Sequence, residues 1–145
     1  MKRGFTLLEI LIVIIIVAIL ATLGITQYMN TIERSRGAEI KQVFGHMRQM
    51  CAALYMEDGV TTRCTDANLG LGAAPQTPDT TGGCRATHHF SYAAANNAAG
   101  TATFTATRCA VGSGGKSESA NGNTAALTVD YAAGGEDTWN NAFGY

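Results

Sequence analysis

Hydrophobic residues are concentrated near the start of the chain. Residues 7–25 include fourteen Leu, Ile and Val residues, and the one charged residue among them is Glu9. A helix over residues 5–25 would be about 31 Å long at about 1.5 Å per residue, which matches a bilayer core of about 30 Å. The pattern therefore predicts a helix that crosses a membrane.

The helical pattern continues beyond this segment. Residues 27–57 contain no proline, and large apolar residues recur mostly three or four positions apart, on one face of a helix. This stripe consists of Ile40, Val43, Phe44, Met47, Cys51 and Leu54. We expect the stripe to pack on the chain's own sheet rather than in the groove of a separate partner. The helix should end at about residue 57, with Gly59 in a left-handed C-cap conformation.

The remainder of the chain is rich in Gly, Ala, Thr and Asn. We expect an irregular loop over about residues 58–86, then a sheet and a tail over about residues 87–145, with a hairpin turn at 96–100. The tail, residues 134–145, contains three aromatic residues that could attach it to the rest of the domain, namely Trp139, Phe143 and Tyr145. Alternating apolar and polar residues predict strands at 88–95, 101–108 and 126–132.

These elements predict an α+β fold. A long N-terminal helix, membrane-spanning in its first half, packs through its second half on a small antiparallel sheet of three or four strands. The 145 residues suffice for one modest domain. Ten Lys and Arg residues against eleven Asp and Glu residues give a formal net charge of −1. This balance supplies no basic field for strong non-specific nucleic-acid binding, and we expect no specific nucleic-acid partner.

The residues before the apolar segment are positively charged. Lys2 and Arg3 predict a cytoplasmic N-terminus and an exported remainder. An ordinary cleaved signal peptide is one alternative, but its apolar region usually has about 7–15 residues and ends in a small-residue cleavage site, which this longer run lacks. A plain single-span anchor is the other alternative. Neither explains Glu9, because a carboxylate inside an apolar span is costly. Glu9 therefore predicts a cationic partner in the working state, with a merely snorkelling acid as the alternative.

The N-terminal residues also resemble a known family. Lys2-Arg3-Gly4-Phe5-Thr6-Leu7-Leu8-Glu9, followed by the aliphatic run, is similar over about residues 1–30 to the class III signal of type IV pilins and pseudopilins. The resemblance implies removal of a leader, residues 1–4, by a prepilin peptidase that cuts between Gly4 and Phe5. It also implies N-methylation of the new Phe5 amine, and pairing of that amine with Glu9 of a neighbouring subunit during assembly.

Two positions depart from the pattern of many family members. Thr26 stands where proline is common, and Ala18 stands where glycine is common. Within the span the chain has a single glycine, Gly24. We therefore expect that any loosening of the helix on assembly either occurs near Gly24 or is weaker than in those relatives.

The four cysteines suggest an oxidising compartment. Their spacings contain no C-x-x-C motif, and an even number behind an exported span indicates two disulfides. Three pairings are possible from sequence. We prefer Cys51–Cys64, which would tie the loop to the helix, with Cys84–Cys109, which would join the entry of one strand to the exit of the next.

The sequence offers no constellation typical of an enzyme. His46, His88 and His89 form no triad or metal cluster by spacing, and we expect neither a catalytic site nor a cofactor. A calcium site is a weak alternative without EF-hand spacing. It would use Asp130, Glu136, Asp137, Asn140 and Asn141.

The sequence thus predicts a structural subunit of a type IV pilus-like filament. Its parts would be a leader at 1–4, an apolar helix at 5–29 and an exported domain at 30–145. By resemblance, its partners would be other copies in a helical filament, the prepilin peptidase, an inner-membrane assembly platform and an ATPase motor. It would lie in the inner membrane before assembly and in an extracellular fibre afterwards, with Arg34, Glu39 and Lys41 as contacts between subunits. The alternatives are a minor pilin, a type II secretion pseudopilin and, from another class, a monomeric membrane-anchored binding or DNA-uptake protein.

Overall fold

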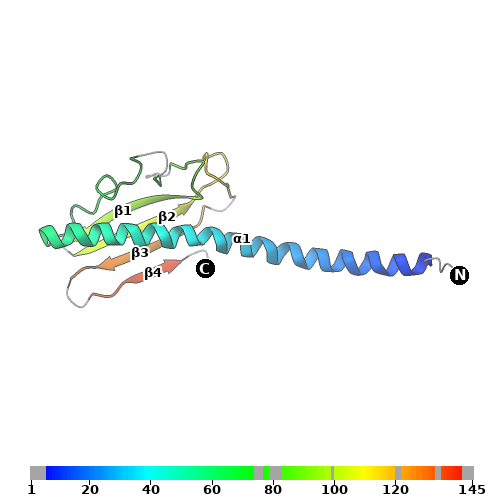
Figure 1. Cartoon of the computed structure of the whole chain (residues 1–145). Coiled ribbons are helices and arrows are strands. Elements are labelled where there is room, and N and C mark those ends of the chain that lie inside the picture. Colours follow the sequence, from blue (N-terminus) through cyan, green and yellow to red (C-terminus); the bar gives the residue numbers. More distant parts are fainter. Residues whose placement is uncertain are drawn as a thin grey trace. The chain divides into compact units, whose positions relative to one another are not determined.

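One long helix and one sheet make up the regular structure of the described residues. The computed structural model describes residues 6–73, 77–78, 83–98, 100–119, 122–132 and 135–141. Helix α1 covers Leu7–Asp58, and the strands are β1 (Phe90–Ala98), β2 (Thr101–Arg108), β3 (Thr124–Asp130) and β4 (Thr138–Asn141), as Figure 1 shows. The chain divides into two compact units, which we call the N-terminal unit (Met1–Ser35) and the C-terminal unit (Arg36–Tyr145).

The helix ends where the sequence predicted. Gly59 follows α1 with a φ angle of 70°, and its N–H donates to the carbonyl of Tyr55 over 2.7 Å. A residue with a side chain would be strained in this left-handed conformation, whereas glycine adopts it freely.

The sheet is antiparallel, with its strands in the order β1-β2-β3-β4. The fourth strand, Thr138–Asn141, lies in the segment expected to be a tail, and it pairs with β3. The expected turn at 96–100 was wrong in its extent, because β1 continues to Ala98, which pairs with Thr101 across a register irregularity. The expected strand 126–132 is displaced, since β3 runs from Thr124 to Asp130.

The start of β1 also differs from the prediction. We expected a strand from His88, but β1 begins at Phe90. The backbone N–H of His89 donates to the carboxylate of Glu39 on α1, over 3.1 and 3.2 Å to its two oxygens. This bond occupies the N–H of His89, while the His89 carbonyl still accepts the N–H of Cys109 over 3.1 Å, and regular pairing starts at Phe90.

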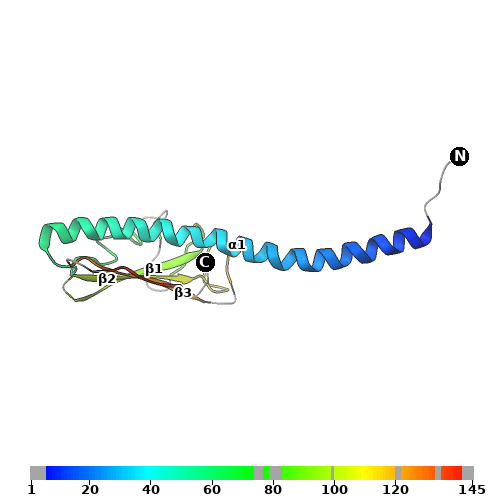
Figure 2. The same ribbon diagram turned by 90° about the horizontal axis from the view of Figure 1, so that it is seen from below.

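The core of the C-terminal unit lies between α1 and the sheet. The second half of α1 covers one face of the sheet, as Figure 2 shows, and the apolar stripe of the helix is buried there, as predicted. Phe44 is 1% exposed, and its ring lies 6.2 Å from that of Tyr92 and 5.6 Å from that of Trp139. Trp139 thus attaches β4 to the helix, while Phe143 and Tyr145 lie outside the described residues.

The described part of the loop after α1 contains no helix or strand, and it is attached to the outer edge of β1. The Asp66 carboxylate accepts the N–H of Ala94 over 2.6 Å, and the Thr62 carbonyl accepts the amide of Asn96 over 3.3 Å. The first bond satisfies a backbone N–H on an edge that would otherwise offer it to another strand, and the second, from the Asn96 side chain, holds the loop beside that edge.

Candidate assembly site on the N-terminal helix

The apolar side chains of the N-terminal unit are exposed along the whole predicted span. Large aliphatic residues between Leu7 and Ile25 are from 45% to 85% exposed, whereas the stripe of the C-terminal unit is buried. The most apolar eighteen-residue window of α1 has a mean hydropathy of 3.0 and is not buried. This segment of α1 is long and apolar enough to cross a membrane.

Thr6 caps the start of α1 beside Glu9. The hydroxyl of Thr6 accepts the backbone N–H of Glu9 over 3.3 Å, and its carbonyl accepts the same N–H over 3.1 Å. Thr6-Leu7-Leu8-Glu9 has the spacing of a capping box, in which an acid at the third helical position follows a threonine cap. The cap therefore fixes Glu9 in the first turn, where the helix dipole favours a negative charge.

No ion pair within the described part of the chain involves the Glu9 carboxylate. The next charged residue along α1 is Glu33. Gly4 and Phe5, where the sequence predicts cleavage and methylation, lie outside the described residues. The described part of the chain therefore supplies no ion-pair partner for Glu9.

The threonines of the apolar segment satisfy their own hydroxyl groups. Thr22 donates to the carbonyl of Ile19 over 2.7 Å, and Thr26 donates to the carbonyl of Leu23 over 3.0 Å. A hydroxyl that bonds to the preceding turn costs little in an apolar environment. Helix α1 is continuous through Gly24, near which we expected any loosening on assembly, and through Thr26, which stands at the usual proline position.

Comparisons with known proteins identify this N-terminal segment. Residues 1–25 match the model of the prokaryotic N-terminal methylation motif. The chain carries a type IV prepilin motif. It is 36% identical over 78 residues to the type IV major fimbrial protein FimA of Dichelobacter nodosus. The aligned segment covers 51% of this chain and 48% of that protein. It is 33% identical over 70 residues to the prepilin peptidase-dependent protein D of Escherichia coli (strain K12), 48% of each chain.

The chain spans about half the length of the curated relatives it matches. No solved structure matches it significantly. The helix-on-sheet architecture with the Cys51–Cys64 disulfide nevertheless fits the pilin fold that the prepilin motif implies.

All four cysteines are paired behind the prepilin motif. The bonds join Cys51 to Cys64 and Cys84 to Cys109, with Cα–Cα distances of 5.2 and 5.8 Å. These are the two pairings that the sequence analysis preferred. The first ties the loop to α1, and the second joins the segment before β1 to the end of β2.

Glu39 occupies a different place from the one we expected. We grouped it with Arg34 and Lys41 as a contact between subunits, and those two residues are exposed. Glu39 instead faces the sheet, where it accepts the hydroxyl of Tyr92 over 3.0 Å as well as the N–H of His89. Burial raises the pKa of the Tyr92 hydroxyl well above its usual range, and the Glu39 charge adds to this shift. Its spacing of four residues from Val43 could have placed Glu39 at the edge of the buried stripe.

Arg108 is the second polar residue that sequence reasoning missed. It is 2% exposed, lies 5.3 Å over the ring of Phe90, and donates to the His89 carbonyl over 2.7 Å and to the carbonyl and hydroxyl of Ser117. Phe104, Ala106 and Arg108 occupy alternate positions of β2 and are all buried, so this alternation in the sequence could have indicated that Arg108 faces the core. Arg108 thereby attaches the loop after β2 to the start of β1.

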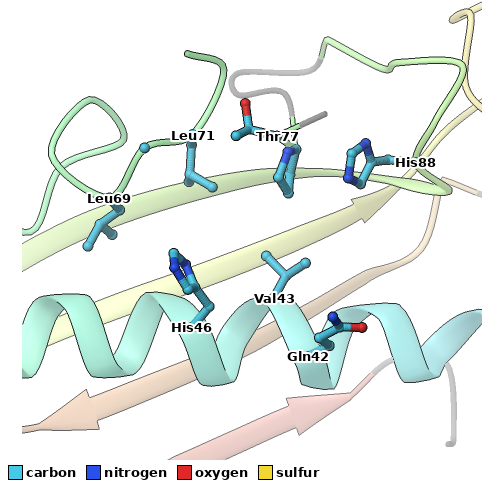
Figure 3. Close-up of a pocket in the computed structure, with 9 residues that line it drawn as sticks. Gln42, Val43, His46, Leu69, Leu71, Thr77 and His88 are labelled. Carbon is cyan, nitrogen blue, oxygen red and sulfur yellow. The ribbon is translucent and has the colours of Figure 1, made fainter. Parts of the chain in front are cut away.

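The three histidines do not form a triad in the structure: His46 and His88 line a common cavity, and His89 does not. His46 lies on α1 (Figure 3). The Nδ1 atom of His88 forms a hydrogen bond with the Thr87 hydroxyl over 2.8 Å, and the Nδ1 atom of His89 forms one with the Ser117 hydroxyl over 2.6 Å. Of the residues considered for calcium, Asp137 forms an ion pair with Arg48 over 2.7 Å, and Asp130 accepts the N–H of Ala132 over 2.9 Å. These acids have local roles in the C-terminal unit.

Proposed function

We propose that this chain is a structural subunit of a type IV pilus-like filament. A prepilin peptidase cuts between Gly4 and Phe5, the Phe5 amine is methylated, and residues 5–25 hold the subunit in the inner membrane with a cytoplasmic N-terminus. The subunits then polymerise through α1 into an extracellular fibre. One observation carries this proposal, namely that the aliphatic side chains of the span are exposed and Glu9 is the one charge among them.

The apolar segment requires a nonaqueous environment. Exposure of its fourteen aliphatic residues to water would cost about 1.5 kcal/mol each, or roughly 20 kcal/mol. A bilayer removes this cost, and so do neighbouring copies of the same helix. A fibre built on these helices should therefore resist dissolving in water, while its subunits could return to a membrane.

Apolar contact between helices provides little free energy for moving a subunit from the bilayer into a filament. Lipid tails are about as apolar as Leu and Ile, so packing of helix on helix yields only a small net gain. The free energy for assembly must then come from a specific ion pair between subunits and from work done by other proteins. The family implies an assembly platform and an ATPase motor as the proteins that do this work.

Glu9 and the processed N-terminus supply such a pair. Glu9 lies four residues after Phe5, which is about 6 Å along a helix. Cleavage creates an ammonium group at Phe5, close to the membrane depth of Glu9 on an adjacent copy. A carboxylate in an apolar environment is stabilised by an opposite charge and is costly without one.

A substitution at Glu9 tests this proposal. We expect Glu9→Gln to reduce the yield of fibres sheared from cells by more than about 100-fold, because it removes one partner of a buried ion pair. The control Glu33→Gln changes the other acid of this stretch of α1 and should leave the yield unchanged. Mass spectrometry of the N-terminus should show that both variants are still inserted and cleaved before Phe5.

Other outcomes would contradict the proposal. Undiminished fibres from Glu9→Gln would refute the pairing. Wild-type protein that retains residues 1–4, or that occurs as a monomer on cells that bear no fibres of this chain, would favour the membrane-anchored binding protein. Fibres that contain the chain as a trace component would favour a minor pilin.

A further inference from the structure

A cavity opens between α1 and the loop that follows it. Its volume is about 260 Å³, and it lies within the C-terminal unit. Figure 3 shows that Val43 and His46 extend from α1 toward Leu69, Leu71 and Thr77 of the loop. His88, which precedes β1, lies at the opposite end of the cavity from His46 (Figure 3).

The loop wall of the cavity is fixed in place. Leu69 and Leu71 are 1% and 7% exposed, so their side chains are part of the core. The N–H of Gly72 donates to the carbonyl of Pro78 over 2.7 Å, and the Arg85 guanidinium donates to the carbonyl of Gly72 over 3.0 Å. The Cys51–Cys64 bond holds the beginning of the same loop on α1. The described part of this wall is therefore held in place without a ligand, which lowers the entropic cost of binding.

The lining combines apolar walls with neutral polar groups. Val43, Leu71 and Pro78 supply apolar surface, and the polar groups are imidazole, amide and hydroxyl groups. No charged side chain lines the cavity among the described residues. Apolar walls with hydrogen-bonding groups at the ends suit a ligand that has an apolar body and a polar substituent.

The size of the cavity suits a single ring. A cavity of about 150 Å³ lined by aliphatic residues holds benzene, so a larger one with polar ends accommodates a ring that carries a substituent. The Nδ1 atom of His88 forms a hydrogen bond with the Thr87 hydroxyl over 2.8 Å. Imidazole rings can stack on an aromatic ligand and also form hydrogen bonds with its substituent.

We propose that this cavity binds a small neutral aromatic molecule with a polar substituent, of which a phenol is the simplest example. The ring would lie between Val43 and Leu71, with His46 and His88 at its two ends. This site is separate from the assembly site at Glu9, and it does not depend on the proposed filament.

The histidines provide a direct test. The chain contains three histidines, so selectively isotope-labelled histidine gives one imidazole signal each for His46, His88 and His89. The full chain in lipid nanodiscs should be titrated with p-cresol. We expect saturable shifts of His46 and His88, while His89, which does not line the cavity, serves as the internal control. Cyclohexanol, of similar size but not aromatic, should bind at least several-fold more weakly, and so should benzoate.

A matched pair of variants links the shifts to the cavity. Thr77→Trp places a large side chain at the rim and should abolish the shifts of both histidines, with the His89 signal unchanged as evidence of folding. Thr62→Trp changes an exposed threonine outside the cavity and should preserve them. Linear shifts of all three signals would show partition into lipid only and would overturn the proposal. The absence of shifts, or equal binding of cyclohexanol, would overturn it as well.

Discussion

The two units of this chain differ in how far their apolar residues are buried. In the N-terminal unit the aliphatic side chains from Leu7 to Ile25 are exposed, whereas in the C-terminal unit Ile40, Phe44 and Met47 are at most 1% exposed. Both sets lie on the same helix, α1. The C-terminal unit thus contains its own core and two disulfides, whereas the aliphatic side chains of the N-terminal unit are exposed, and we propose that lipid or other copies cover them. A single helix can therefore serve as a core element in one half and as a contact surface in the other.

The largest expected effect comes from the centre of the core. Phe44→Ala should reduce the free energy of unfolding of the C-terminal unit by about 3–5 kcal/mol, because it removes a buried ring that touches Tyr92, Phe104 and Trp139. Ile14→Ala, on the exposed half of α1, should change it by less than about 0.5 kcal/mol. The fluorescence of Trp139, the single tryptophan of the chain, reports unfolding in denaturant. Equal losses in the two variants would remove the distinction between the units.

The disulfides come next in magnitude. Replacing Cys51 and Cys64 together by Ala should cost about 3 kcal/mol, because the unfolded chain gains the freedom of the opened loop. The same unfolding measurement applies, and the yield of leader-cleaved protein should not change. An unfolding free energy within about 0.5 kcal/mol of wild type would show that the loop is held by its hydrogen bonds alone.

A smaller effect is expected at Glu39, the acid that joins α1 to β1. Glu39→Gln should destabilise the C-terminal unit by about 1–2 kcal/mol, since it replaces charge-assisted hydrogen bonds with neutral ones. The control Glu57→Gln removes an exposed pair with Arg63 and should cost less than about 1 kcal/mol. If Glu39→Gln were as mild as its control, the inward position of Glu39 would not contribute to stability.

The smallest expected effect is a dependence on pH through His89. Burial lowers the pKa of His89 below its ordinary value of 6.5, and the Arg108 and Lys116 charges add to this shift, against the opposing charge of Glu39. As the pH falls below 6.5, the unfolded chain takes up this proton before the folded chain does, so the folded state loses stability down to the pKa of folded His89. Because His89 is partly exposed, the loss should stay below about 1 kcal/mol.

The contribution of His89 can be isolated with one variant. Denaturant unfolding at a series of pH values should show a smaller slope in His89→Gln, and an unchanged slope in His88→Gln. A slope that persists in full in His89→Gln would assign the pH dependence to other groups.

Much of this fold follows from local patterns in the sequence. The spacing of the stripe, the glycine after the helix and the alternation in β2 each depend on neighbouring residues, and the structure bears them out. The position of the fourth strand was not predicted, because Thr138–Asn141 is too short to carry a pattern and forms through pairing with β3. The polar residues Glu39 and Arg108 were also missed, since their partners, His89 and Ser117, come from distant parts of the chain.

The candidate assembly site differs in this respect. The motif around Glu9 is contiguous, so the sequence alone identified its residues, and the structure adds the Thr6 cap that holds Glu9 in the first turn of α1. The partner that we propose for Glu9 belongs to another copy of the chain. For this reason neither the sequence nor the structure of one subunit can contain the complete site.

The most direct test is a high-resolution structure of fibres sheared from cells, determined by electron cryomicroscopy. The measured quantity is the distance from the Glu9 carboxylate to the Phe5 nitrogen of each neighbouring copy. Our account predicts a separation within about 4 Å, the usual limit of an ion pair, between residues of two different subunits. A Glu9 carboxylate that contacts only its own chain, with every neighbouring Phe5 amine beyond that distance, would contradict it.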